Sequence, residues 1–210
     1  SSVRVVVSCT TVISAATQGV ISTQGSTTLG NYVTVGVNSG VTLNFGAGGG
    51  STIGVGSSAI ITNNGTLDTG SFYNGYGISA GANGRSQDGN NSITNTSTGL
   101  ITTAGGNAAG IYVSATNAGS AANTIENAGS ITTSGANAAG IRLVSGAKSS
   151  AVVNTIINRY STPGTGVIST SGVGANGIQV SGVGAVTVEN TGTITTTGNF
   201  ALTWAGGGYV

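Results

Sequence analysis

The chain has 210 residues, of which 39 are glycine, one is proline and only 4% are charged, with a net charge of +1. Its five basic residues are scattered along the sequence, which argues against a nucleic-acid binder or a polybasic membrane patch, because contact with phosphates needs clustered Lys and Arg. There is no histidine, and Cys9 is the only cysteine, so the composition excludes an internal disulfide, a Cys–His metal site and a Ser-His-Asp triad.

The first 57 residues are expected to form an N-terminal cap and irregular coils. Runs rich in β-branched residues occur at 3–7 and 12–21, and such strands could cover the first open edge of a repeat array. Apolar alternation continues through 32–45, interrupted by turns. We therefore predict a cap with degenerate coils over 1–57 and one continuous repeat domain over 58–210.

From residue 58 onward a short sequence motif recurs in imperfect copies. Its clearest copy spans 126–141, Glu-Asn-Ala-Gly-Ser-Ile-Thr-Thr-Ser-Gly-Ala-Asn-Ala-Ala-Gly-Ile. The apolar residue after the turn recurs roughly every 32 residues, and periods of this size are typical of solenoids, propellers or arrays. No stretch combines helical apolar spacing with freedom from glycine, whereas β-branched residues are frequent. The repeat therefore predicts an all-β solenoid with about three short strands per coil.

Stacking of these coils should align like residues in ladders. Successive side chains of a strand alternate between faces, so an inward Ile131 places Thr133 inward and Thr132 outward. Coils stacked about 4.8 Å apart would then form an internal isoleucine row and a ladder of mutually bonded asparagine amides. The asparagines are interpreted as structural, with a ligand site as the less favoured alternative. The predicted ladder residues are Asn95, Asn127, Asn158, Asn190, Ile101, Ile131, Ile168 and Ile194.

Aromatic residues gather in the loop over 70–90. Phe72, Tyr73, Tyr76 and Arg85 lie there, and aromatic side chains on a loop suit glycan stacking or protein contact. The same side chains could equally fold back to cover the solenoid. These four residues are the predicted contacts with a partner.

The carboxylates do not form a recognisable catalytic pair. There are four, and Glu126 and Glu189 occupy the same repeat position two copies apart, which separates them by roughly 10 Å along the axis. They are interpreted as outward partners for cations of the loops rather than as an acid/base pair. The chain is therefore expected not to be an enzyme, with no catalytic, cofactor or metal site.

A rank of hydroxyl groups is predicted on one outer face. Thr102, Thr132, Ser169 and Thr195 should align there, and a flat array of this kind could order water on ice. The preferred interpretation is a soluble, uncharged face with high β-propensity. Unequal coil lengths also argue against a regular ice-binding lattice.

The motif at 127–135, followed by Asn-Ala-Ala-Gly-Ile at 137–141, resembles the repeats of bacterial autotransporter passenger domains. The resemblance covers roughly residues 58–204. It implies a right-handed parallel β-helix, export through an outer-membrane barrel, and a role as an adhesin or surface fibre. The sequence lacks the translocator barrel and the Gly-Asp-Ser-Gly signature of protease passengers, so the chain would be a fragment, a cleaved passenger or another use of the repeat.

These observations favour a non-enzymatic structural protein, extracellular or on the bacterial outer surface. It would serve as an adhesin passenger or as the subunit of a self-assembling fibre. Its expected partners are itself, because uncapped strand edges pair, and a host surface glycan or protein. No apolar run reaches the ~20 residues of a membrane-spanning helix. The alternatives are a polysaccharide-active β-helix enzyme and an ice-binding solenoid.

Overall fold

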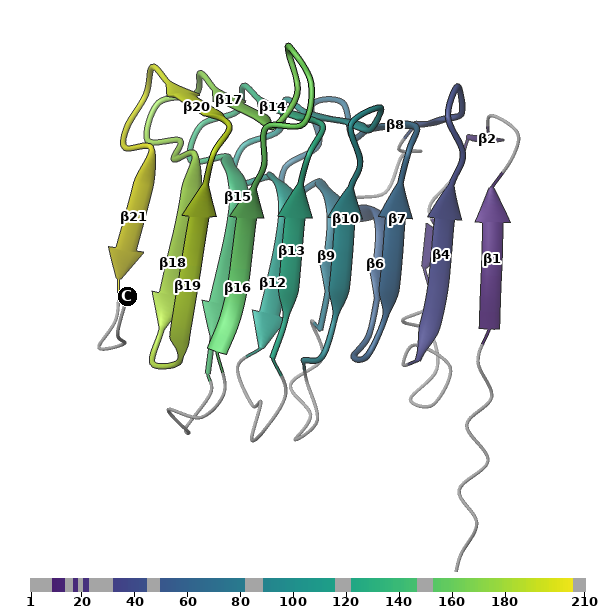
Figure 1. Cartoon of the computed structure of the whole chain (residues 1–210). Coiled ribbons are helices and arrows are strands. Elements are labelled where there is room, and N and C mark those ends of the chain that lie inside the picture. Colours follow the sequence, from purple (N-terminus) through teal and green to yellow (C-terminus); the bar gives the residue numbers. More distant parts are fainter. Residues whose placement is uncertain are drawn as a thin grey trace, which may run out of the picture.

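The structure is a computed structural model that describes residues 9–13, 17–18, 21–22, 32–44, 50–81, 89–115, 122–146 and 153–205. These residues form 21 β-strands and no helix, which confirms the all-β prediction (Figure 1). Consequently, none of them belongs to a helix with the length and apolarity needed to cross a bilayer. The predicted run at 3–7 and the predicted contact Arg85 lie outside the described residues.

The strands form three sheets of seven strands each. The first sheet contains β1 (Cys9–Ile13), β4 (Val33–Val37), β7 (Ile60–Asn63), β10 (Ser92–Asn95), β13 (Thr124–Asn127), β16 (Val153–Asn158) and β19 (Ala185–Asn190). The second contains β2 (Thr17–Gln18), β5 (Thr42–Asn44), β8 (Thr66–Asp68), β11 (Leu100–Thr103), β14 (Ser130–Thr133), β17 (Val167–Thr170) and β20 (Thr193–Thr196). The third contains β3 (Ile21–Ser22), β6 (Ser51–Val55), β9 (Tyr76–Ala80), β12 (Ala109–Ala115), β15 (Ala139–Ser145), β18 (Ile178–Gly182) and β21 (Leu202–Ala205).

Three consecutive strands, one from each sheet, make one coil of a parallel β-solenoid. Every strand pairs in parallel with the equivalent strand of the next coil, as β10 does with β13. In Figure 1 the first sheet runs upward in front, the third runs downward behind, and the coils advance from β1 towards β21, which is a right-handed winding. The same three sheets contain strands from both predicted parts of the chain, 1–57 and 58–210.

Alternation within the strands builds the core. In β14, Ile131 and Thr133 are buried while Thr132 is exposed, as predicted from the alternation of side chains. Strand pairing aligns Ile131 with Ile101 on one side and with Ile168 on the other, and all three are fully buried. Each buried aliphatic side chain stabilises the fold by about 1.5–3 kcal/mol, so stability accumulates over several coils.

Glycine is required where the second sheet turns into the third. A Cβ atom on Gly140, at the start of β15, would lie 2.3 Å from Cγ2 of Ile168 and 2.6 Å from the carbonyl oxygen of Gly177. Nearby, Asn107 and Asn137 adopt the left-handed backbone conformation, with φ of 53° and 55°. Asparagine tolerates this conformation better than most residues. The sharp corner thus explains Gly140, Asn107 and Asn137, whereas the asparagines predicted to form the ladder are not among the residues with positive φ.

Candidate functional site

The predicted asparagines form a continuous hydrogen-bonded ladder inside the rod. The Nδ2 of Asn63 donates to the Oδ1 of Asn95 at 2.9 Å, and Asn95, Asn127 and Asn158 each donate in the same way to the next coil at 2.8 Å. The last acceptor is Asn190. The four donors of the ladder are fully buried. Their amides bond to one another and to nearby backbone carbonyls, as Asn158 does to Gly166. This arrangement supports a structural interpretation of the ladder.

A second asparagine ladder, which was not predicted, lies where the strands of the first sheet begin, whereas the first ladder lies where they end. The Nδ2 of Asn91 donates to the Oδ1 of Asn123 at 2.9 Å, and Asn123 donates to Asn154 at the same distance. Asn154 donates to the Oγ of Ser145 at 3.0 Å. The separations of 32 and 31 residues match the coil length, so the same repeat would have revealed this ladder in the sequence.

The third sheet carries three outward, half-buried side chains at one register position, Tyr112, Arg142 and Gln179. Ser79 occupies this position in β9, and the half-buried Tyr76 of the same strand contacts Tyr112 through its ring. Tyr76 and the three aligned residues are here called the tyrosine–arginine row. Strand pairing places Arg142 beside Tyr112 on one side and beside Gln179 on the other. The rings of Tyr76 and Tyr112 stack with centroids 4.7 Å apart and an interplanar angle of 25°. The guanidinium carbon of Arg142 lies 5.6 Å from the centroid of the Tyr112 ring, within the range of a cation–π contact.

The predicted partner contacts divide between this row and the corner beside it. Tyr76 stacks within the row, whereas Tyr73 is 64% exposed and its hydroxyl accepts a hydrogen bond from the Nδ2 of Asn107. Phe72 is half-buried. The prediction did not include Tyr112, although its position directly after the inward Ile111 repeats in the neighbouring coils and could have indicated it.

Burial and neighbouring rings influence the ionisation of Tyr76. Partial burial raises its pKa above the ordinary value of 10.0, and the nearby Tyr112 and Tyr73 raise it further. The positive charge of Arg142 acts in the opposite direction and lowers the pKa. The phenol is therefore held neutral beyond the pH at which an isolated tyrosine ionises.

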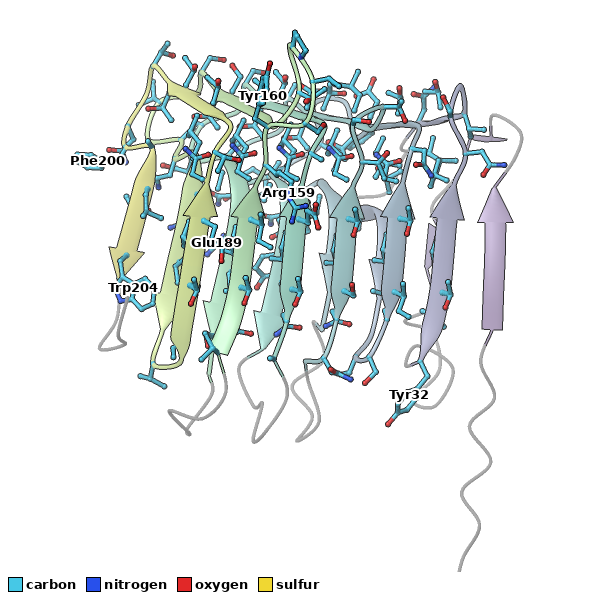
Figure 2. All side chains as sticks on the ribbon, viewed as in Figure 1. Tyr32, Arg159, Tyr160, Glu189, Phe200 and Trp204 are labelled. Atoms are coloured by element: carbon cyan, nitrogen blue, oxygen red, sulfur yellow. The ribbon has the colours of Figure 1, made fainter. Side chains whose placement is uncertain are left out.

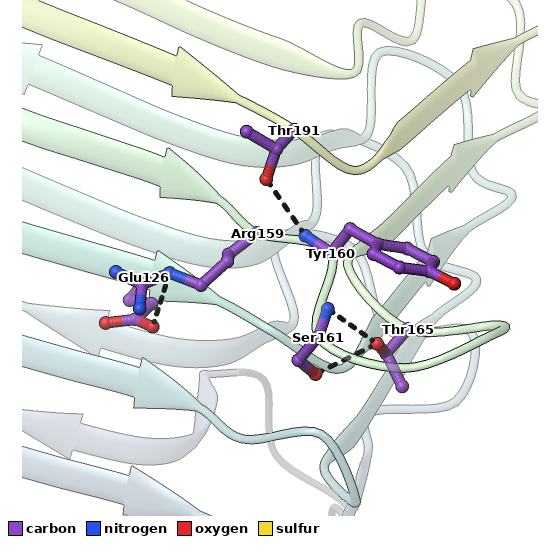
Figure 3. A network of polar contacts seen from close by, with 6 residues as sticks. All are labelled: Glu126, Arg159, Tyr160, Ser161, Thr165 and Thr191. Carbon is purple, nitrogen blue, oxygen red and sulfur yellow. Dashed lines mark hydrogen bonds and ion pairs between the residues drawn. The ribbon is translucent and has the colours of Figure 1, made fainter.

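The carboxylates of the first sheet are separated by an intervening strand. Strand pairing aligns Glu126 with Ile157, and Ile157 with Glu189, so the two glutamates are two coils apart. Glu126 forms an ion pair with Arg159, with Oε1 and Nε 3.4 Å apart (Figure 3). This is the only ion pair within the part of the chain that the structure describes.

The outer edge of the last coil exposes side chains of the kind that other coils bury. Ile168 and Ile178 are fully buried, but their partners in the last coil, Ile194 and Leu202, are partly buried and 44% exposed. Phe200, which Figure 2 places at this end of the rod, is 65% exposed. Within the described residues, β19, β20 and β21 each pair on one side only.

Neither a cluster of metal-binding side chains nor a related protein points to a further site in the described residues. No group of three or more His, Cys, Asp or Glu side chains that could hold a metal occurs among the described residues. Comparison of the chain with family models, with curated proteins and with solved structures gives no match. Function therefore has to be inferred from the geometry of the solenoid itself.

Proposed function

We propose that the chain is a non-enzymatic structural β-solenoid of the extracellular space or bacterial surface. It would act as the subunit of a self-assembling fibre or as an adhesin passenger, like the autotransporter passenger domains that its repeat resembles. The observation that carries this proposal is the outer edge of the last coil. There, β19 and β20 each have one unpaired edge in the described structure, and apolar side chains are exposed.

An edge of this kind favours association with another copy. Unpaired strand edges present backbone donors and acceptors that can pair with another strand. Among the described residues the first coil, β1 to β3, also pairs on one side only, so a head-to-tail contact would repeat without closing and produce a filament. The net charge of +1 on 210 residues provides little electrostatic repulsion between copies.

Negative-stain electron microscopy at low and high protein concentration tests the fibre. We expect filaments at high concentration, and we expect Leu202→Lys, which places a charge on the open edge, to prevent them. Val173→Lys is the matched control, because Val173 is 83% exposed in a turn of the preceding coil and the change in charge is the same. Only short rods of the unmodified chain at every concentration would contradict the fibre and leave the adhesin to be tested by ligand binding.

One observation favours a second candidate, an ice-binding solenoid. Strand pairing aligns Thr102, Thr132, Ser169 and Thr195 across four coils despite their unequal lengths. Neighbouring strands lie about 4.8 Å apart, so these hydroxyl groups recur at a regular spacing. The rank is interrupted at Asp68, which aligns with Thr102. Thermal hysteresis in a freezing assay would support this candidate, and its absence would remove it.

A further inference from the structure

Arg142 is a cation to which the described residues offer no counter-charge. Arg142 is half-buried on the third sheet, and no carboxylate lies within ion-pair distance of it among the described residues. Its Nε is buried and has no hydrogen-bond partner there. By contrast, Arg159 is paired with Glu126. Because Nε is closed to solvent, a ligand could meet this half-buried guanidinium only through its terminal nitrogens, where a carboxylate would supply the counter-charge that no described residue provides.

The surroundings hold this cation in place and provide further polar groups. Strand pairing places Arg142 of β15 beside Tyr112 on one side and Ser79 of β9 on the other. The ring of Tyr76, three residues before Ser79, nevertheless reaches the ring of Tyr112 and stacks on it. Tyr76 and Arg142 both contact the Tyr112 ring, so the flat guanidinium is oriented by stacking before any ligand arrives. The phenols of Tyr76 and Tyr112 lie beside the cation, and Gln179 adds an amide in the next coil.

We propose that the tyrosine–arginine row binds an acidic glycan, with a sugar carboxylate on the guanidinium of Arg142. The row follows the rod axis, and the coil spacing of about 4.8 Å is comparable to the length of one sugar unit in an extended chain. Successive sugars would meet Tyr112, Arg142 and Gln179 in turn. Glycan hydroxyls both donate and accept, as the phenols and the amide do.

The exposed Tyr73 extends the site beyond the row. Its side chain is 64% exposed, and Asn107 holds its hydroxyl, so the ring is fixed while remaining open to solvent. A fixed aromatic ring is suited to stacking against the apolar face of a sugar. An acidic peptide could satisfy Arg142 but would gain less from this combination of ring, hydroxyl and amide. This inference depends on the proposed function in one respect: a protein on the cell surface or outside the cell would encounter such a glycan there.

Calorimetric titration with a short oligogalacturonate tests the site, with its fully methyl-esterified form as the neutral counterpart. We expect the esterified form to bind roughly tenfold more weakly or worse, and Arg142→Gln to weaken oligogalacturonate binding by a similar factor. Gln is compatible with the fold at this position, since Gln179 occupies the equivalent place in the next coil. Circular dichroism would verify that the variant is folded.

Arg159→Gln is the matched control, because it removes the same charge directly after β16 of the first sheet, away from the row, and should leave binding unchanged. Three results would overturn the proposal: no binding of oligogalacturonate, equal loss in both arginine variants, or equal affinity for poly-L-glutamate. Each is independent of whether filaments form under the microscope. A site that fails this test therefore leaves the fibre intact, and a failed fibre leaves this site intact.

Discussion

At the scale of single residues, the asparagines provide directional contacts between coils that aliphatic side chains cannot provide. In the interior of the rod, Asn127 accepts from Asn95 and donates to Asn158, so its amide is satisfied on both sides. A buried amide without these bonds would carry a desolvation penalty. The ladder therefore favours one register, since a coil shifted by one residue would leave amides unpaired.

Replacement of one interior asparagine tests this account. We expect Asn127→Ala to lower the free energy of unfolding by about 2–3 kcal/mol, because it leaves the Oδ1 of Asn158 without its donor in a buried site. Asn190→Ala at the exposed end of the ladder should cost less than about 1 kcal/mol. Urea titration of both variants provides the measurement, and equal losses would contradict a burial-dependent ladder.

The pKa of Tyr76 predicts a specific response to alkaline pH. Because the pKa is raised in the folded state, the neutral phenol contributes stability below its ordinary pKa near 10, and this contribution disappears as the pH rises through the higher folded value. We expect Tyr76→Phe to lose less stability than the unmodified chain between about pH 9 and pH 11. Tyr160→Phe, at a side chain that is 52% exposed, is the control and should follow the unmodified chain.

At the scale of the strand, alternation and repeat length made most of the fold predictable. Isoleucine and asparagine recur at the coil period, so their strands could be placed without a structure. The tyrosine–arginine row was missed because Tyr112, Arg142 and Gln179 share a register position but not a residue type, so only their position directly after an inward isoleucine could have indicated them. The aromatic residues of the loop over 70–90 were recognisable in the sequence. The stacking of Tyr76 on Tyr112 was not, because the two residues are 36 positions apart.

Glycine at the start of the third strand provides a test at this scale. We expect Gly140→Ala to lower the free energy of unfolding by about 1–3 kcal/mol, because its Cβ would meet the Ile168 side chain and a backbone carbonyl. Gly36→Ala is the control, since a Cβ there would have no atom within 4 Å. Thermal unfolding should separate the two variants, and an equal effect would argue against tight corner packing.

At the scale of the whole molecule, the rod combines a long apolar interior with a nearly uncharged surface. Charged residues are 4% of the chain, and the described residues form one ion pair. Association between copies should therefore depend on strand edges and apolar side chains rather than on complementary charge. This property distinguishes the proposed fibre from an assembly held together by electrostatics.

Salt provides the corresponding measurement. We expect the rate and extent of filament formation to change little between about 0.02 M and 0.5 M sodium chloride, because few charges are available for screening. Light scattering during assembly, with electron microscopy of the end products, would follow both quantities. Dissolution of the filaments at high salt would instead indicate an ionic contact between copies.

The direction of the strands has a mechanical consequence. The strands run across the rod, so the hydrogen bonds that join successive coils lie along its length. A force that draws the chain ends apart would peel the outermost strand bond by bond instead of shearing whole sheets. Each detached coil of 32 residues would lengthen the tether by about 100 Å. Under load the rod would therefore extend in repeated steps of one coil. Each step would add the unfolded length of that coil while the remaining coils stay folded.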